Sequence, residues 1–332
     1  MSKVDDVAKL SNVSKGTVSN VFSGKRPTSD EVKKRVLEAA RILKYTPNHI
    51  ARSLVTKKTL IIGLKMPYGK NVSLGSLHTD ILTGVVTEAA AKNYRVLIDT
   101  IPPGEQNRPY ISTDPIDGVI VLGPERDDVR IKALCQSDIP FVVIGVPYGI
   151  TEVSYVDNNN EEMLAAIVSL LAGKGRKKIL FLNAVETKTV AMIRGEGFKK
   201  GLEENRLEFR ETDMVYNRYL YEDSIIYGYN ATMEAFRSGG GHDAIIADTD
   251  RVAAGVLKAL KEMGKQAQKD IPVVALSDDY LLSRESDAPL TTVNLFPGLL
   301  GREAVKLLME KMQQPDAYSD RRVIIPARII ER

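Results

Sequence analysis

The segment that decides the fold is residues 4–58, which read VDDVAKLSNVSKGTVSNVFSGKRPTSDEVKKRVLEAARILKYTPNHIARSLVTKK. Apolar residues recur at helical spacing over Val4–Leu10 and again over Lys15–Phe22. The tripeptide Ser11-Asn12-Val13 separates them, and asparagine tolerates the left-handed backbone of a tight turn. Ser14 can cap the second helix. We therefore predict two short helices joined by a turn.

A third helix is predicted to begin near Thr28 or Ser29. Either hydroxyl can serve as the N-cap, and Asp30 and Glu31 suit the positive end of a helix. The apolar side chains that then repeat at helical spacing are Val32, Val36, Ala39, Ala40 and Leu43. They would close a core of three helices.

The second helix presents small polar side chains on its outer face. Val18 and Val21 can face inward, which turns Lys15, Gly16, Thr17, Ser19 and Asn20 outward. Small residues permit close approach to a duplex, and hydroxyls and amides can bond phosphates or base edges. The pattern favours DNA binding over the alternative, a small three-helix bundle with another role.

The charge of the chain is divided unevenly. Residues 1–58 carry 13 basic and 5 acidic side chains, a net charge of +8, whereas the whole chain has a net charge of +3. Residues 59–332 therefore have a net charge of −5. This asymmetry suggests that only the first segment meets a polyanion, although a solvated basic surface is equally consistent with charge alone.

Residues 47–54, which begin with a proline, are predicted to form a short helix. Eight residues are too few for a helix to be stable alone in water, so it would fold only against a partner. Ala51 is small enough for close approach to a minor groove, and Leu54 on the same face could wedge between base pairs. The alternative is a linker with one buried leucine.

From Leu60 onward the sequence alternates short apolar runs with helical patterns. Val- and Ile-rich runs of this kind are typical of parallel sheets covered on both faces, so an α/β body is expected. The predicted strands are Leu60–Leu64, Arg95–Asp99, Gly118–Leu122, Phe141–Gly145, Ile179–Leu182, Asp243–Ala247 and Pro272–Leu276. The predicted helices are Ser76–Lys92, Asp128–Cys135, Glu161–Ala172, Met192–Glu204, Ser224–Phe236, Arg251–Met263 and Pro297–Lys311.

We predict three segments and two lobes. A helix-turn-helix domain would cover 1–46, a hinge helix and linker 47–58, and an effector-binding and dimerisation domain 59–332. Within the last, the first lobe is expected at about 59–157 and 290–319, and the second at about 158–289 and 320–332. Paired lobes suit a small-molecule site between them.

Several function classes are disfavoured. The sequence contains no dinucleotide-binding glycine motif, nucleotide-phosphate loop, nucleophile elbow or zinc-protease motif, so no enzyme, cofactor or metal is expected. No apolar run approaches the length of a membrane span. The N-terminus has no signal-peptide pattern, and Cys135 is the single cysteine. A cytoplasmic protein without intrachain disulfides is expected.

Three motifs resemble a known family. They are D-V-A at 6–8, V-S-x-x-T-V-S at 13–19 and Y-x-P-N-x-x-A-R-S-L at 45–54. At these spacings residues 3–58 resemble the head of the LacI/GalR (lactose-repressor) family. The resemblance implies a two-lobed body like that of periplasmic binding proteins, and a pseudo-palindromic double-stranded DNA operator bound by a homodimer.

The resemblance also implies roles for individual residues of the head. Helix 15–22 would enter the major groove, and Leu54 of each protomer would open a central step from the minor groove. The residues implied to hold phosphates are Ser14, Thr17, Ser19 and Ser29. Lys15, Gly16 and Asn20 would lie where bases are read, and Asn48, Ala51 and Leu54 complete the DNA-binding set.

Asn20 stands where the family usually has arginine. Arginine favours guanine and asparagine favours adenine, because each side chain matches a different pair of groups on the base edge. We therefore expect an adenine preference at the base pair that faces Asn20. Gly16 leaves another base without a side-chain contact.

The resemblance weakens over the body but indicates an effector site. Arg194 matches a position that grips ligand oxygens, as a guanidinium can do with two hydrogen bonds. Asp250 matches an acid that either contacts ligand or caps a helix. Thr249, Ser277, Tyr68 and Phe296 complete the expected set. Gly145, Thr249 and Ser277 replace polar residues of sugar binders, which puts an ordinary hexose effector in doubt.

Ile101–Ile116 is a further departure from the family. Four prolines predict a loop where relatives have a helix.

The sequence as a whole favours a DNA-binding regulator, with repression as the expected activity and a carbohydrate or related metabolite as effector. A two-lobed solute receptor is the second hypothesis, opposed by the basic head. A sugar-modifying enzyme is the third, and it lacks a catalytic constellation.

Overall fold

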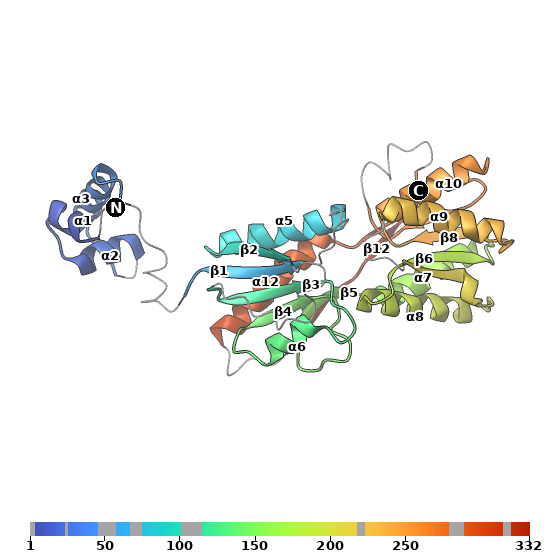
Figure 1. Cartoon of the computed structure of the whole chain (residues 1–332), viewed down its shortest axis with the longest axis horizontal. Coiled ribbons are helices and arrows are strands. Elements are labelled where there is room, and N and C mark those ends of the chain that lie inside the picture. Colours follow the sequence, from blue (N-terminus) through green and yellow to red (C-terminus); the bar gives the residue numbers. More distant parts are fainter. Residues whose placement is uncertain are drawn as a thin grey trace. The chain divides into compact units, whose positions relative to one another are not determined.

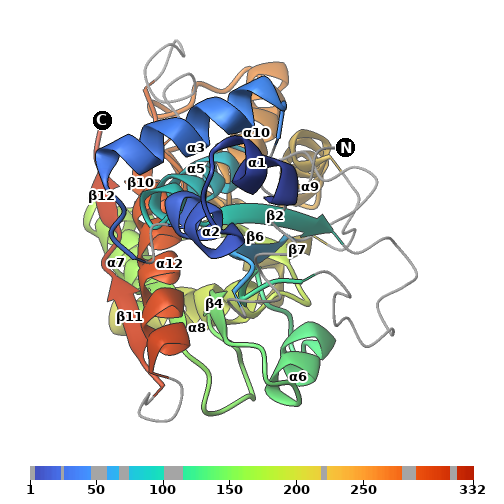
Figure 2. The same ribbon diagram turned by 90° about the vertical axis from the view of Figure 1, so that its left-hand side faces the viewer.

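The computed structural model describes residues 4–23, 26–45, 58–66, 75–100, 115–217, 223–278, 289–314 and 320–332. The chain divides into two compact units, Met1–Thr59 and Leu60–Arg332. They are called the head and the body below. Both are drawn in Figure 1, and Figure 2 turns the same ribbon by 90°.

The head is a bundle of α1 (Val4–Leu10), α2 (Lys15–Ser23) and α3 (Asp30–Ile42). Asn12 adopts the left-handed conformation expected of the turn, with φ of 51°. The Ser29 hydroxyl caps α3 by accepting a hydrogen bond from the Val32 amide at 3.4 Å. The buried core comprises Val7, Ala8, Val18, Val36, Ala39 and Ala40. The predicted three-helix core is confirmed.

The predicted hinge helix cannot be compared with the structure. Asn48, Ala51 and Leu54 lie outside the described residues, as do Tyr68 and residues 101–114 of the proline-rich segment.

The first sheet of the body has the strand order β11-β5-β4-β3-β1-β2. All five adjacent pairs are parallel. Strands β1, β3 and β4 lie inside the sheet, and all of their residues except Ile61 are buried, whereas β2 is an edge strand. The strands are β1 (Ile61–Met66), β2 (Arg95–Thr100), β3 (Gly118–Leu122), β4 (Phe141–Ile144), β5 (Tyr155–Asn158) and β11 (Arg322–Ile325).

The second sheet has the order β12-β10-β9-β8-β6-β7. Only β12 runs antiparallel to its neighbour among the described pairs. The strands are β6 (Ile179–Val185), β7 (Met214–Asn217), β8 (Ala244–Ala247), β9 (Val273–Ala275), β10 (Thr291–Asn294) and β12 (Arg328–Ile330).

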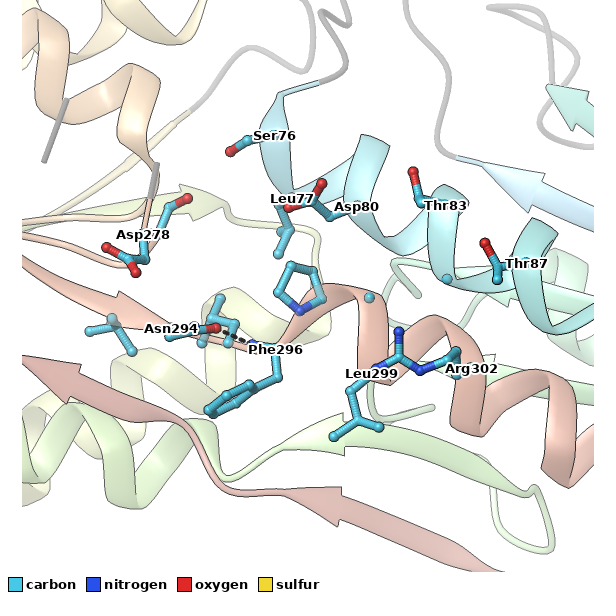
Figure 3. A pocket seen from close by; sticks show the side chains of 16 residues that line it. Ser76, Leu77, Asp80, Thr83, Thr87, Asp278, Asn294, Phe296, Leu299 and Arg302 are labelled. Atoms are coloured by element: carbon cyan, nitrogen blue, oxygen red, sulfur yellow. Dashed lines mark hydrogen bonds between the residues drawn. The ribbon is translucent and has the colours of Figure 1, made fainter. Parts of the chain in front are cut away.

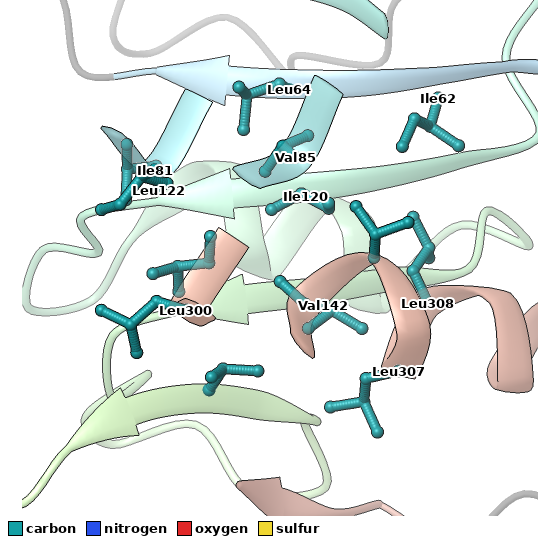
Figure 4. Close-up of a cluster of buried hydrophobic side chains, with 14 of the residues drawn as sticks. Ile62, Leu64, Ile81, Val85, Ile120, Leu122, Val142, Leu300, Leu307 and Leu308 are labelled. Carbon is teal, nitrogen blue, oxygen red and sulfur yellow. The ribbon is translucent and has the colours of Figure 1, made fainter. Parts of the chain in front are cut away.

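Helices cover both faces of each sheet. Side chains of α5 and α12 pack together on the first sheet, where Ile81, Val85, Leu300 and Leu308 meet Ile120 (Figure 4). Helix α6 covers the opposite face. In the second lobe α7 and α8 cover one face and α9 and α10 the other. The helices are α5 (Ser76–Ala91), α6 (Val129–Cys135), α7 (Asn160–Gly173), α8 (Thr189–Glu204), α9 (Ser224–Arg237), α10 (Asp250–Glu262) and α12 (Pro297–Gln313).

The chain crosses between the lobes three times, after β5, after β10 and after β11. The three crossings are tied together at Asn158. Its amide donates hydrogen bonds to the carbonyl oxygens of Leu295 at 3.0 Å and of Ile325 at 2.8 Å. Nearby, the Asn159 side chain accepts one from the amide of Ala327.

The crossings correct the predicted lobe boundaries. The segment 290–319 was predicted in the first lobe, but its strand β10 pairs with β9 in the second. The segment 320–332 was predicted in the second lobe, but its strand β11 pairs with β5 in the first. Both strands are only four residues long, so their sequences carry too little pattern to reveal which sheet they join. Helix α12 packs on the first lobe as predicted.

Among the described helices, none is both long enough and apolar enough to cross a membrane.

Candidate DNA-binding face and effector site

The outer face of α2 is polar and accessible. Ser14, Lys15, Gly16 and Ser19 are exposed, whereas Val18 on the opposite side is fully buried. Thr17 and Asn20 are half-buried at the edge of this face. One helix with its cap Ser14 thus serves the core and presents the predicted residues between Ser14 and Asn20 together, whereas Ser29 lies at the start of α3.

Local hydrogen bonds fix the start of α2. The Ser14 hydroxyl accepts a hydrogen bond from the Thr17 amide at 3.1 Å and lies 2.9 Å from the Thr17 hydroxyl. The Lys15 ammonium lies 2.8 Å from the Asp5 carboxylate, with both side chains exposed. An exposed pair of this kind contributes little stability, so Lys15 can exchange Asp5 for a phosphate or a base at small cost.

In the body, Arg194 is buried and already paired. Its Nη1 donates a hydrogen bond of 2.5 Å to Oδ1 of Asp248, and the two side chains are 7% and 11% exposed. Its Nε donates to the side-chain oxygen of Asn160 at 2.9 Å. Arg194 extends from α8, Asn160 from the start of α7, and Asp248 follows β8. The arginine is thus held at the carboxyl end of the second sheet, where open α/β sheets bind ligands.

Asp157 extends this network. The Asn160 amide donates to both Asp157 oxygens at 3.2 Å, so Asn160 links two ionisable groups. Burial raises the pKa of Asp157 to about 6, against the lowering effect of its hydrogen bonds and of Arg194. Burial also raises the pKa of Asp248 even though Arg194 is adjacent. A carboxyl group that titrates near neutrality is typical of a functional site.

A second ion pair joins the two lobes. Lys188 of the second lobe donates to Glu125 of the first at 2.8 Å and to the Gly123 carbonyl at 3.2 Å. Burial lowers the pKa of Lys188, whereas the neighbouring Glu125 carboxylate acts to raise it. The backbones pair as well, with Arg126 N–H donating to Thr187 O at 3.0 Å and Thr189 N–H to Pro124 O at 3.2 Å.

Asp250 makes a further contact between the lobes. It accepts a hydrogen bond from the hydroxyl of Ser76, the first residue of α5, at 3.1 Å. The helix cap is Thr249, whose hydroxyl accepts from the Val252 amide at 3.2 Å. His78 on α5 lies close enough for Asp250 and Lys188 to influence it, and burial lowers its pKa.

We call this set of polar residues the interlobe cluster. It comprises Ser76, His78, Glu125, Asp157, Asn160, Lys188, Arg194, Asp248 and Asp250.

Two other predicted effector residues line a neighbouring pocket of about 430 Å³ (Figure 3). Ser277 is buried in its wall, and Phe296 lies where β10 leads into α12. Phe296 has φ of 49°, a strained conformation for a residue with a large side chain. Ser76 lines the pocket and also bonds Asp250, so the pocket and the interlobe cluster adjoin. Arg194, Thr249 and Asp250 are not among the lining residues.

Gly145 has a structural reason to replace an aspartate. Its φ is 109°, and an added Cβ atom would lie 2.6 Å from Cδ of Pro124. This backbone therefore accepts only glycine. Substituting an acid would require the Pro124 segment, which pairs with the second lobe, to move.

Sequence reasoning missed part of the cluster. Asp248, Lys188 and Asn160 were not predicted, since each bonds a partner 34 or more residues away in the sequence. The position of Asp248 directly after a predicted strand was the one available indication.

A three-helix head with an accessible polar helix, followed by two lobes with largely parallel sheets and a polar cluster between them, defines a class of protein. It is the ligand-responsive DNA-binding regulator. Comparisons with known proteins agree. Residues 3–48 match the bacterial regulatory proteins of the lacI family, and residues 168–332 match the periplasmic binding protein-like domain.

Individual relatives cover nearly the whole chain. The HTH-type transcriptional regulator CelR of Thermobifida fusca is 28% identical over 312 residues, which span 92% of this chain and 90% of that protein. A solved complex of transcriptional regulator CelR with cellobiose is 25% identical, with a TM-score of 0.75 over 99% and 98% of the two chains. A lac repressor dimer bound to operator and the anti-inducer ONPF is 23% identical, with a TM-score of 0.86 over 100% and 98% of the chains, and shares the fold.

The chain belongs to the LacI family of bacterial regulatory proteins. It is a DNA-binding transcriptional regulator and not an enzyme, because the family consists of regulators.

Proposed function

We propose that two copies of this protein bind one pseudo-palindromic operator and repress transcription, and that a carbohydrate-like effector in the body changes the affinity for DNA. The observation that carries the proposal is the exposed polar face of α2. The side chains of this face are not part of the hydrophobic core of the head, so they remain available to bind DNA. A protein that acts on DNA in this way belongs in the cytoplasm.

In this proposal the exposed residues of the head divide into two groups. Ser14, Thr17, Ser19 and Ser29 bond phosphates, for which short hydroxyl side chains near helix starts are suited. Lys15 and Asn20 reach base edges, and Gly16 lets the backbone approach. Asn48, Ala51 and Leu54 act in the minor groove.

An apolar edge of the first lobe supports the dimer. Val86 on α5 is 43% exposed, and Leu97 and Ile98 on edge strand β2 are 36% and 47% exposed. An edge strand with exposed apolar side chains favours association with another chain, because unpaired backbone groups lie next to an exposed hydrophobic surface. Contact between two first lobes at α5 and β2 would cover this edge.

The interlobe cluster supports the effector role. Its residues come from both lobes, so a ligand bound there changes how the lobes contact each other. Cellobiose is bound by the related CelR structure, which makes a neutral disaccharide a suitable first probe. Arg194, Thr249 and Asp250 would contact the effector, with Ser277, Phe296 and Tyr68 on the side of the adjoining pocket.

The experiment is selection of short duplexes by the purified full-length protein, followed by sequencing of the bound fraction. The proposal predicts a pseudo-palindrome with an adenine at the base pair facing Asn20. It also predicts affinity that falls steeply with salt, because phosphate neutralisation releases counterions. Equal binding of all sequences, with and without a metabolite mixture, would contradict it.

A further inference from the structure

Lys15, the first residue of α2, is paired with an acid before it meets DNA. Its ammonium lies 2.8 Å from Oδ1 of Asp5, the second residue of α1. The two side chains are 67% and 41% exposed, so a duplex can approach both. Lys9 lies one turn from Asp5 on α1, but within the described residues it is Lys15 that makes the ion pair. A contact between two helices therefore directs the Lys15 side chain.

Asp5 lies at the surface that is proposed to meet DNA. Together with Ser14 and Lys15 it lines a hollow of about 670 Å³ between α1 and α2. Ser14 is one of the residues proposed to bond a phosphate, so a bound duplex would bring negative charge towards the Asp5 carboxylate. A carboxylate is repelled by phosphates, so Asp5 cannot serve as a phosphate contact at this surface.

The donors of Lys15 match one base when Asp5 is included. An ammonium group carries three N–H donors and no acceptor. With one donor on Asp5, two remain, and guanine presents two acceptors in the major groove, O6 and N7. A phosphate that approached Lys15 would instead approach the Asp5 carboxylate as well, and the two anions repel each other.

We propose that Asp5 positions Lys15 for guanine and keeps it away from phosphates. An exposed ion pair adds little to the stability of the head. Its effect is on specificity, which increases when the wrong contact is made repulsive as well as when the right one is made attractive. This inference rests on the proposed base-reading role of Lys15.

The test compares the full-length protein with its Asp5→Asn variant by fluorescence anisotropy, on the selected operator and on an unrelated duplex. Asparagine removes the charge and keeps the size of the side chain. The variant should bind the unrelated duplex at least about threefold more tightly, because Lys15 is then free to bind a phosphate. The ratio of the two affinities should fall at least about tenfold, within the range of one lost base contact.

Salt dependence separates this role from a structural one. Lys15 gains a phosphate in the Asp5→Asn variant, so the slope of log affinity against log salt for the unrelated duplex should steepen by about 1. A residue that only stabilised the head would weaken binding to both duplexes when substituted. Weaker binding to both duplexes, or an unchanged ratio of affinities, would overturn the proposal.

Two further variants show whether Asp5 acts through Lys15. Selection with Lys15→Ala identifies the base pair that Lys15 faces, as the one where the guanine preference disappears. In the Lys15→Ala background, Asp5→Asn should change the ratio of affinities by less than about twofold. Asp5→Glu, which keeps the charge, should preserve most of the ratio. An equal fall with and without Lys15, or selection of another base at this position, would contradict the proposed role.

Glu38→Gln is the matched control. Glu38 also forms an exposed ion pair in the head, with Arg41 at 2.6 Å, and the substitution likewise removes one negative charge. Both partners lie on α3, so neither affinity is expected to change. A fall in the ratio equal to that of Asp5→Asn would reveal a general effect of net charge and overturn the proposal. Thermal unfolding verifies that each variant is folded.

Failure of the proposed function has a different signature. If the unsubstituted protein binds all duplexes equally, the proposed operator recognition is wrong. The unrelated duplex still decides the role of Asp5, since its salt dependence should steepen in Asp5→Asn and stay the same in Glu38→Gln. An unchanged ratio on an operator that the protein does select would count against Asp5 alone.

Discussion

The head and the body place their functional residues in opposite ways. The head exposes the polar residues of α2, and the hydrophobic core of its described residues consists of six apolar side chains. The body buries most of the charged groups of its interlobe cluster, where Arg194 pairs with Asp248 and Lys188 with Glu125 across elements that are distant in the sequence. A surface that reads DNA can therefore change with little cost in stability, whereas the interlobe cluster is part of what holds the body together.

The largest effect that sharpens this contrast is expected from Arg194→Ala. Removing the guanidinium leaves Asp248 buried without a partner, which costs about 3–5 kcal/mol in the free energy of unfolding. Urea denaturation of the body measures this loss. The double variant Arg194→Ala/Asp248→Ala should recover part of it, and a double variant no more stable than Arg194→Ala would contradict the pairing.

Helix packing in the body provides the next largest effect. An added Cβ atom at Gly255 on α10 would lie 2.1 Å from the carbonyl oxygen of Ile225 on α9. Gly255→Ala should therefore lower the free energy of unfolding by about 1–3 kcal/mol, since the two helices must separate. Gly173→Ala is the control, because nothing lies within 4 Å of its added atom. Equal thermal unfolding of the two variants would argue against close packing of α9 and α10.

In the head, Asn20→Ala should change recognition without changing stability. Loss of a side chain that reads a base costs about 1–3 kcal/mol in affinity for the selected operator. Affinity for an unrelated duplex should stay the same, as measured by fluorescence anisotropy. Glu38→Gln, on the exposed side of α3, is the control and should alter neither affinity. Equal losses on both duplexes would show that Asn20 contacts the backbone instead.

The smallest effect concerns pH and lies in the second lobe. His242 is buried, its Nε2 lies 3.0 Å from Asp213, and burial lowers its pKa below 6.5. The unfolded chain then binds the proton more readily than the folded one. The free energy of unfolding should therefore decrease as the pH falls below about 6.5. His242→Gln should remove this part of the pH dependence, as measured by urea denaturation between pH 7.5 and 5.5. The same pH dependence in the His242→Gln variant and the unsubstituted protein would contradict this role of His242.

The sequence revealed most of the regular structure because local pattern determines it. Strand Gly118–Leu122 and helix Val4–Leu10 have the predicted bounds. The strands β5 and β7, with the sequences YVDN and MVYN, were missed because they are short and partly polar. Strands β10 to β12 were not predicted either, because their pairing depends on three crossings that tertiary contacts determine.

The site followed the same division. The predicted DNA-binding residues from Lys15 to Asn20 are exposed or half-buried on α2. Such a set can be predicted from the sequence because residues close in sequence are also close in space on a helix. In the body, Arg194 and Asp250 lie in the interlobe cluster, while Ser277 and Phe296 line the adjoining pocket. Asp248 could not be predicted as the partner of Arg194, because 54 residues separate them.

The most direct test of the account is the affinity of the full-length protein for its selected operator, with and without a neutral sugar that binds by calorimetry, starting with cellobiose. If the body controls the head, the dissociation constant for DNA should change by about 5- to 150-fold, the usual size of coupling between two sites. The affinity for the sugar should change by the same factor when operator is present. An unchanged dissociation constant at saturating sugar would show that the two units bind independently, which contradicts the account.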